Sequence, residues 1–327
     1  MKVLIVGAGG MVGAKLAKQL AEDGSIADKP IDAMILADVV RPNPPDNSGM
    51  AITTETVDVS EPGAADRIVA SRPDVIFHLA AIVSGEAETD FEKGYRINLD
   101  GTRSVLDAIQ RIGDGYCPRL VFTSSIAVFG APVPELIGDE FFQTPLTSYG
   151  TQKAIAELLL SDYTRRGFLD GIGIRLPTIV VRPGLPNKAA SGFFSGIIRE
   201  PLAGKEAILP VPDSIRHWHA TPRTAVNFLI HAAGLDGAAV GTRRNLSMPG
   251  VSVTVAEQIA ALRRIAGDRV ADRIVRKPDP AIMRIVEGWP RNFSPERALA
   301  LGFRAEANFD EIIRIHIEDE LGGTWVA

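Results

Sequence analysis

The chain has 327 residues, of which 46% are hydrophobic and 23% are charged, and its formal net charge at pH 7 is -5. This length and composition predict a globular protein with a large core, either one large α/β unit or two associated domains, and they exclude small disulfide-stapled folds. The negative net charge gives no general attraction to nucleic acid or anionic lipid, so neither is an expected partner.

The cysteine content and the first residues favour a cytoplasmic protein. Cys117 is the single cysteine, and its place just before an apolar run predicts a small buried thiol, which fits a reducing compartment. The opening MKVLIVGAGG contains too short an apolar run for a secretory signal, and no later run approaches the length of a membrane span. We therefore expect a cytoplasmic location and no membrane partner.

Apolar runs alternate with segments of helical periodicity in the first half of the chain. Strands are predicted at residues 3–6, 34–37, 52–57, 75–80 and 120–123, and helices at 11–23, 62–71, 87–112 and 147–166, with Ser60 and Ser148 as N-caps near two helix starts. Continuous apolar strands separated by helices indicate a parallel sheet covered on both faces. The predicted fold class is α/β with a doubly wound parallel sheet.

A glycine turn follows the first predicted strand. In GAGGMVG, Gly7, Gly10 and Gly13 are spaced three apart before a helical segment. Such a turn lets the backbone approach a pyrophosphate, and the helix N-terminus at Met11 and Val12 then binds its negative charge. The sequence therefore predicts a dinucleotide site.

Asp38 ends the second predicted strand. A carboxylate there binds the adenosine ribose hydroxyls and repels a 2'-phosphate, so NAD is favoured over NADP, although Arg41 could reach a phosphate.

The GxxGxxG spacing, with Val12 where the common GxGxxG fingerprint has glycine, resembles the extended branch of the short-chain dehydrogenase/reductase superfamily. The resemblance implies a Rossmann fold, NAD as cofactor and a homodimer formed through the helices at 87–112 and 147–166. It also implies a set of further cofactor contacts, namely Asp58, Val59, Leu79, Ala80, Ala81 and Asn98.

Two later segments resemble the catalytic motifs of that family. FTSSIAVFG places Ser125 at the catalytic serine, with Ser124 nearer the cofactor, and SYGTQKAIAELLL supplies Tyr149 and Lys153 on one helix face. A tyrosine that acts as a base near neutrality needs its pKa lowered by about three units, or roughly 4 kcal/mol. An ammonium about 4 Å from the phenol, at an effective dielectric of about 20, stabilises the phenolate by a similar amount, roughly 4 kcal/mol.

The resulting hypothesis assigns a role to each of these side chains. Tyr149 takes the proton of a secondary alcohol while the hydride passes to NAD, Lys153 lowers the tyrosine pKa and holds the nicotinamide ribose, and Ser125 orients the substrate.

Beyond about residue 170, prolines interrupt the pattern. We expect residues 1–175 to form the NAD-binding domain and residues 176–327 to form mainly a smaller substrate-binding region, with some segments returning to the first domain. Residues 172–187 look like a sixth strand that brings Pro177 and Thr178 to the cofactor.

The whole chain resembles the subgroup of extended enzymes that act on small sugar acids, which implies oxidation at carbon 2 to a 2-keto acid. Arg182 and Arg216 are the candidate cations for the substrate carboxylate. The other predicted substrate contacts are polar side chains, namely Ser84, Ser125, Tyr149, Asn187 and Ser191.

Three alternatives remain open: a nucleotide-sugar 4-epimerase that keeps its NAD, an L-threonine-type dehydrogenase, and a non-catalytic NAD-sensing regulator. Dehydratases related to the epimerases usually carry an acidic pair directly after the serine position. Ile126 and Ala127 stand there in this chain, which argues against a dehydratase. The presence of serine, tyrosine and lysine argues against a regulator. His217 and His219 lack further ligands at a suitable spacing, so no metal site is expected.

Overall fold

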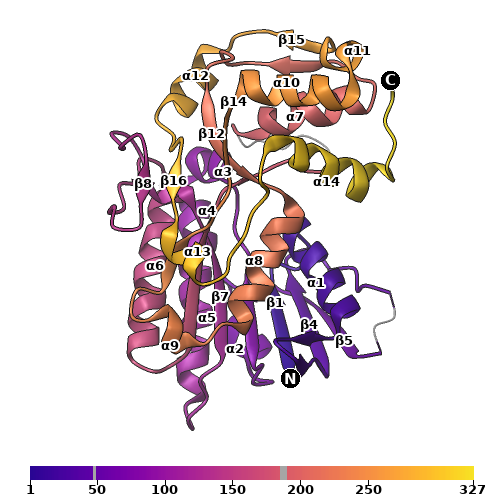
Figure 1. Ribbon diagram of the computed structural model, residues 1–327. Coiled ribbons are helices and arrows are strands. Elements are labelled where there is room, and N and C mark those ends of the chain that lie inside the picture. Colours follow the sequence, from indigo (N-terminus) through magenta and orange to yellow (C-terminus); the bar gives the residue numbers. More distant parts are fainter. Residues whose placement is uncertain (47–48, 185–189) are drawn as a thin grey trace. The chain divides into compact units, whose positions relative to one another are not determined.

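The computed structural model describes residues 1–46, 49–184 and 190–327, and the chain forms two compact units (Figure 1). Unit 1 comprises Met1–Val128, Thr147–Leu176 and Val226–Met248, and unit 2 comprises Phe129–Leu146, Pro177–Ala225 and Pro249–Ala327. Each unit is therefore built from segments that are far apart in the sequence.

A parallel sheet forms the centre of unit 1. Its strands, in chain order, are β1 (Lys2–Val6), β4 (Ala33–Asp38), β5 (Ala51–Thr56), β6 (Val75–His78), β7 (Arg119–Ser125), β9 (Asp170–Leu176) and β13 (Asn245–Ser247). The order across the sheet is β13-β9-β7-β6-β1-β4-β5, and every neighbouring pair is parallel. The order reverses between β1 and β6, and doubly wound sheets bind ligands at the carboxyl ends of the strands beside such a reversal. The predicted fold class is confirmed.

Helices cover this sheet on both faces. The helical segments of unit 1 are α1 (Met11–Asp23), α2 (Ala64–Val69), α3 (Ser84–Thr89), α4 (Phe91–Gly94), the π-helical turn η1 (Tyr95–Asp100), α5 (Gly101–Ile112), the 3-10 turn η2 (Ile126–Val128), α6 (Ser148–Arg165) and α9 (Gly237–Val240). Helix α8 (Pro222–Gly234) starts in unit 2 and continues in unit 1. A short hairpin joins β2 (Ser25–Ile26) to β3 (Lys29–Pro30).

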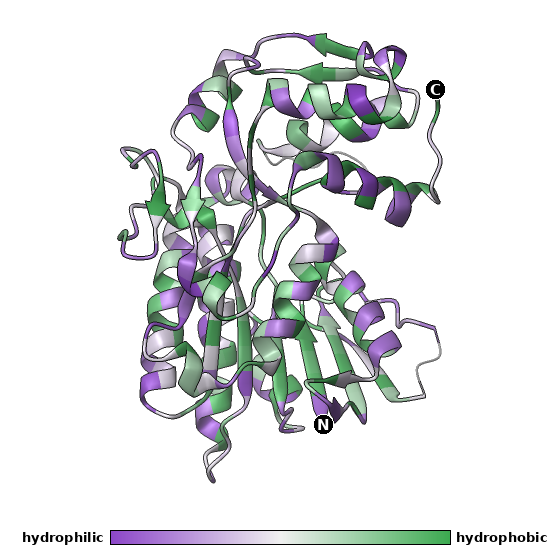
Figure 2. Cartoon of the chain, in the orientation of Figure 1, coloured by the Kyte–Doolittle hydropathy of each residue, from purple (hydrophilic) through white to green (hydrophobic). Residues whose placement is uncertain are grey.

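The alternation of side chains along β1 explains the two covered faces. Leu4 and Val6 belong to one buried cluster with residues of α2, α5 and α6, and the intervening Ile5 is also fully buried. Successive side chains of a strand point to opposite faces, so both faces of β1 are covered. The sheet is accordingly mostly hydrophobic in Figure 2.

Several predicted boundaries were wrong for local reasons. The helix expected at 87–112 is interrupted, because the Asp90 side chain caps a new helix at Lys93 N and η1 follows before α5 begins. Thr147, rather than Ser148, caps α6 by accepting a hydrogen bond from Gly150 N. Gly63, rather than Ser60, precedes α2.

Two further expectations were also wrong. Cys117, expected to be buried, is exposed, because it lies in the loop before β7. The sixth strand, expected at 172–187, ends as β9 at Leu176, because Pro177 has no N–H for a strand ladder. Only Thr178–Ile179 continue as β10, in another sheet, and residues 185–187 lie outside the described part of the chain.

The described residues of unit 2 form three small sheets and several helices. The sheets are β10 (Thr178–Ile179) with β12 (Arg216–Ala220) and β14 (Val251–Thr254), β11 (Ala207–Leu209) with β15 (Ile274–Arg276), and β16 (Phe293–Ser294) with β8 (Ile137–Gly138). The helices are α7 (Gly192–Leu202), α10 (Val255–Ala266), α11 (Asp268–Ala271), α12 (Pro280–Glu287), α13 (Glu296–Ala300) and α14 (Phe309–Leu321).

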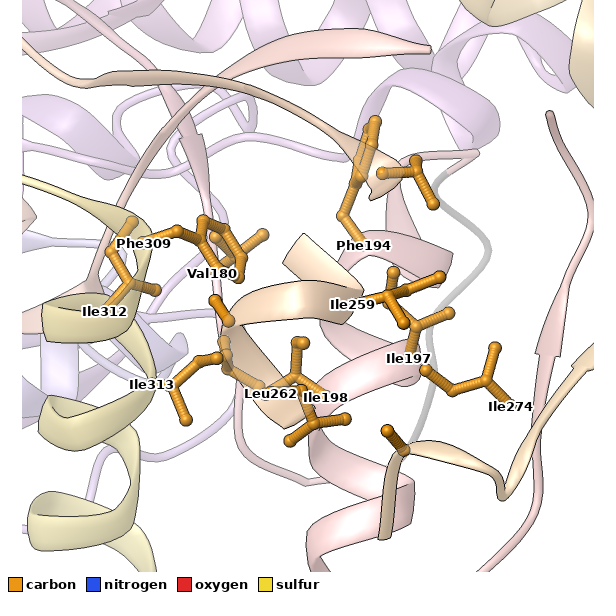
Figure 3. Close-up of a cluster of buried hydrophobic side chains, with 14 of the residues drawn as sticks. Val180, Phe194, Ile197, Ile198, Ile259, Leu262, Ile274, Phe309, Ile312 and Ile313 are labelled. Atoms are coloured by element: carbon orange, nitrogen blue, oxygen red, sulfur yellow. The ribbon is translucent and has the colours of Figure 1, made fainter. Parts of the chain in front are cut away.

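Figure 3 shows the core of unit 2, where apolar side chains of three helices meet. Ile197 and Ile198 come from α7, Leu262 from α10, and Ile312 and Ile313 from α14, and all five are buried. No described helix is long and apolar enough to cross a membrane.

Candidate active site

The glycine turn lies between β1 and α1 in unit 1. Gly7 has a φ of 95°, a conformation that favours glycine, and a Cβ there would lie 2.6 Å from the backbone nitrogen of Ala80. A Cβ on Gly13 would lie 2.2 Å from the carbonyl oxygen of Gly7. These two positions therefore require glycine for the strand, the turn and the helix to approach one another.

The N-terminus of α1 presents backbone donors at this turn. Gly10 precedes the helix without a side-chain capping bond, and the first turn, which starts at Met11, Val12 and Gly13, contains no acidic residue. The amides and dipole of such a helix end favour an anionic ligand. The turn and its donors fit the pyrophosphate of NAD.

Asp38 lies against the glycine turn at the carboxyl end of β4. Its Oδ2 accepts a hydrogen bond from Gly9 N at 2.9 Å, and its Oδ1 accepts one from Val40 N at 3.2 Å. These bonds fix a carboxylate beside the turn, where it can accept hydrogen bonds from ribose hydroxyls and would repel a 2'-phosphate. The position of the Asp38 carboxylate therefore fits NAD rather than NADP.

We predict that Asp38→Ser reduces the preference for NAD over NADP about 10- to 100-fold, because a hydrogen bond to a charged group contributes about 1.5–3 kcal/mol. The ratio of kcat/KM values with the two cofactors measures the effect. Glu55→Ser is the matched control, since it removes the same charge from an exposed position on neighbouring β5. An unchanged ratio in Asp38→Ser would contradict the assignment.

The loop after β6 is held to β1 and to α6. Leu79 N and Ala80 N donate to the carbonyl oxygen of Val6 at 2.8 and 3.0 Å, and Ala81 follows in the same loop. Fully buried Asn98 accepts from Ile82 N at 2.8 Å.

The side-chain amide of Asn98 also donates to Gln152 Oε1 at 2.8 Å. Gln152 immediately precedes Lys153 on α6. Asn98 thus ties the loop after β6 to the helix that carries Tyr149 and Lys153.

The Asp58 carboxylate is engaged by its own surroundings. It accepts from Ser60 N at 2.9 Å, from Ser60 Oγ at 2.6 Å and from Arg96 Nη1 at 3.2 Å. Burial raises the pKa of Asp58, but the hydrogen bonds from Ser60 and Arg96 outweigh it and lower the pKa below its usual value. Val59 beside it is buried. The adenine contact of these two residues stays a prediction.

The strand end that carries Ser125 packs directly against the first turn of α6. A Cβ on Gly150 would lie only 2.2 Å from the carbonyl oxygen of Ala127, so glycine permits the approach. Ser125 Oγ accepts a hydrogen bond from Ala127 N at 3.1 Å, which leaves the hydroxyl hydrogen as the donor that the serine can offer a ligand. Tyr149 lies in the same first turn of α6.

Lys153 is almost fully buried at 2% exposure. Its Nζ donates to the carbonyl oxygen of Thr123 at 2.7 Å and lies 5.7 Å from the centroid of the Tyr149 ring. The effect of the ammonium on the pKa of Tyr149, expected from the sequence for a separation of about 4 Å from the phenol, stays a prediction. Burial lowers the pKa of Lys153 to about 7, and the negative charge of Glu157 opposes this.

A buried ion pair that the sequence patterns did not predict lies one helical turn from Lys153 on α6. Glu157 is 1% exposed and accepts hydrogen bonds from Arg175 at 2.9 Å from Nε and 2.7 Å from Nη2. Ser124 donates to Glu157 Oε1 at 2.5 Å, and its expected place nearer the cofactor stays a prediction. The available signal was the spacing, because Glu157 follows Lys153 by four positions and so shares its helix face.

The predicted substrate residues are divided between the units. In unit 2, Arg182 Nη2 donates to Ser191 Oγ at 2.8 Å, whereas Arg216 donates to the carbonyl oxygen of Ser252 and pairs with Glu257. In unit 1, Ser84 is the first residue of α3. Asn187 lies outside the described residues.

Pro177 is buried in unit 2, and Thr178 hydrogen-bonds to His217. His217 Nδ1 lies 2.9 Å from the carbonyl oxygen of Pro290, which can only accept, so Nδ1 carries the hydrogen. Burial lowers the pKa of His217 to about 4, so the ring is neutral at pH 7 and its Nε2 accepts from the Thr178 hydroxyl at 2.6 Å. The Thr178 oxygen can therefore only accept hydrogen bonds from a ligand.

His78 and His219 fit structural roles. His78 Nε2 lies 2.8 Å from Thr102 Oγ1, and burial together with the charge of Lys153 lowers the pKa of His78 to about 3. His219 is fully buried beside Gln258. Within the described ranges, no group of three or more histidine, cysteine, aspartate or glutamate side chains is placed to hold a metal ion.

Comparison with known proteins identifies the family. Residues 3–220 match the model of the NAD dependent epimerase/dehydratase family. D-erythronate dehydrogenase of Cupriavidus necator is 46% identical over 98% of both chains. D-erythronate dehydrogenase of Haemophilus influenzae is 41% identical over 98% of this chain and 100% of its own.

A solved structure is also very similar. The crystal structure of a nucleoside-diphosphate-sugar epimerase from Agrobacterium tumefaciens has a TM-score of 0.97 and 63% identity, and it covers 99% of this chain and 95% of its own. Because the family model matches most of the chain and the relatives span nearly all of it, the chain belongs to the NAD dependent epimerase/dehydratase family and is an NAD-dependent dehydrogenase.

Proposed function

We propose that this enzyme oxidises D-erythronate at carbon 2 to 2-dehydro-D-erythronate. The observation that carries the proposal is the identity of 46% and 41%, over nearly the full length, to two relatives named D-erythronate dehydrogenase. The serine on β7 and the tyrosine and lysine on α6, which resemble the catalytic set of the family, support the same chemistry. The assignment of residues 1–175 to NAD binding and of 176–327 mainly to substrate binding is part of the proposal.

In the proposed reaction, bound NAD supplies the hydride acceptor. The Tyr149 phenolate removes the proton of the substrate hydroxyl as the carbonyl forms, and that proton then passes to solvent. The Ser125 hydroxyl donates a hydrogen bond to the reacting oxygen, and the Lys153 ammonium favours the phenolate. Arg182 and Arg216 are the candidate cations for the substrate carboxylate, with Ser84, Asn187 and Ser191 as polar contacts.

The direct test is NADH formation with D- and L-erythronate and D- and L-threonate, with NADP assayed in parallel. We expect D-erythronate with NAD to give the highest kcat/KM. Failure of all four acids would reject the proposed substrate, and rapid oxidation of added L-threonine would favour a threonine-type dehydrogenase instead.

A second candidate is a nucleotide-sugar 4-epimerase, because the Agrobacterium structure at 63% identity carries an epimerase name. An epimerase returns the hydride and releases no NADH. Conversion of a nucleotide sugar to its epimer without a change in NADH absorbance would therefore support this alternative.

We further propose a cytoplasmic homodimer, as the family resemblance implies. Light scattering during size-exclusion chromatography tests the dimer, since a monomer would elute with a mass near 35.0 kDa.

A further inference from the structure

Glu157, Arg175 and Ser124 form a buried charged network in unit 1 that the proposed reaction does not use. The Glu157 carboxylate accepts hydrogen bonds from Nε and Nη2 of Arg175 and from the hydroxyl of Ser124. The side chains of Glu157 and Arg175 are only 1% and 13% exposed. The network links α6 to two neighbouring strands, β7 and β9.

This network meets the candidate catalytic side chains through both α6 and β7. On α6, Glu157 lies one helical turn beyond Lys153. On β7, the carbonyl oxygen of Thr123 accepts from Lys153 Nζ at 2.7 Å, the side chain of Ser124 donates to Glu157, and Ser125 follows. Thr123 and Ser124 of β7 therefore bind the Lys153 ammonium and the Glu157 carboxylate, respectively.

A buried ion pair of this kind is weak evidence for added stability, because the cost of removing both charges from water can exceed their attraction. The geometry indicates another role for the ion pair of Glu157 and Arg175. Lys153 is buried, and burial disfavours its charged form, so a fixed negative charge one turn away opposes that loss.

We propose that Glu157 is a positioning residue for Lys153: its carboxylate, fixed by Arg175 and Ser124, keeps the Lys153 ammonium charged and so sets the alkaline limit of activity. The catalytic part of this inference rests on the proposed roles of Tyr149 and Lys153. The effect on the charge of Lys153 does not depend on which alcohol is oxidised.

The groups that face Lys153 fix the direction of the effect. Tyr149 and Glu157 lie on α6, and His78 on β6 is neutral at pH 7 because its pKa is about 3. Arg175 on β9 pairs with Glu157. In Glu157→Gln the negative charge is lost and the positive charge of Arg175 remains. The pKa of Lys153 then falls, and the ammonium is lost at a lower pH than in the wild type.

The experiment compares wild type with Glu157→Gln, both saturated with NAD. The 13Cε resonance of Lys153, followed by NMR as a function of pH and assigned with Lys153→Arg, reports the charge of the lysine. The pH profile of kcat/KM for D-erythronate reports the alkaline limit. We expect both to move to lower pH by about one unit or more, since a nearby opposite charge shifts a pKa by about one to three units.

Two further variants keep the test decisive. Asp162→Asn removes the same charge from an exposed position on α6 and should leave the Lys153 titration unchanged. Glu157→Gln combined with Arg175→Gln removes both buried charges, so it should move the titration back toward the wild-type value. This double variant also tests the proposal if Glu157→Gln alone is unstable.

Unchanged titration of Lys153 in Glu157→Gln, or equal shifts in Glu157→Gln and the double variant, would overturn the proposal. A loss of kcat at every pH without movement of the alkaline limit would show a merely structural role and would also overturn it. If wild type does not oxidise D-erythronate, the proposed substrate fails, while the NMR titration still decides the role of Glu157.

Discussion

Tyr149→Phe is expected to reduce turnover about 100- to 10,000-fold, the range that a positioned general base contributes. Phenylalanine keeps the ring next to Lys153, whose Nζ lies 5.7 Å from the Tyr149 ring centroid, and it removes only the hydroxyl that exchanges the proton. The affinity for NAD should stay close to that of the wild type, because the glycine turn and Asp38 are unaffected. Steady-state kinetics and a fluorescence titration with NAD measure the two quantities.

Tyr163→Phe is the matched control for this prediction. Tyr163 lies on the same helix, and its hydroxyl donates to Asp107 rather than to a group of the candidate site. Its removal should leave turnover per folded molecule unchanged. Near-normal turnover in Tyr149→Phe would exclude Tyr149 as the base, and equal losses in both variants would indicate a general effect on α6.

The fold was largely predictable because its central strands are continuous apolar runs. The strand expected at 3–6 and the helix expected at 11–23 agree with β1 and α1, since a buried strand, a glycine turn and an amphipathic helix each leave a local pattern. The break in the helix expected at 87–112 was not predictable in this way. It depends on a local cap by Asp90 and on a π-helical turn, whose residue Asn98 binds the loop after β6 and Gln152.

The candidate site was predictable where a steric or chemical rule applies to neighbouring residues. Gly7 and Gly13 are required because side chains there would meet backbone atoms, and the spacing of Tyr149 and Lys153 follows from one turn of a helix. The pairing of Glu157 with Arg175 was not predictable, because it depends on the packing of α6 against β9. Such a contact leaves no periodic pattern in the sequence.

Gly13→Ala is expected to destabilise the protein by about 1–3 kcal/mol, the usual cost of an overpacked position, and to weaken NAD binding at least about tenfold. The new Cβ would lie 2.2 Å from the carbonyl oxygen of Gly7 and 2.8 Å from the Cα of Ala8. Both are backbone atoms, so α1 must move away from β1, and the amides at its N-terminus then leave the turn. Thermal unfolding without NAD and a binding titration measure the two effects.

Gly10→Ala separates this steric cost from the general effect of losing a glycine. Its Cβ would lie 3.5 Å from the same Gly7 oxygen, an ordinary contact, and its φ of -74° is accessible to alanine. The unfolding midpoint without NAD should therefore stay near the wild-type value in Gly10→Ala and fall in Gly13→Ala. Equal midpoints in the two variants would mean that α1 can shift without cost, and the close approach of helix and strand would then not be what requires glycine at position 13.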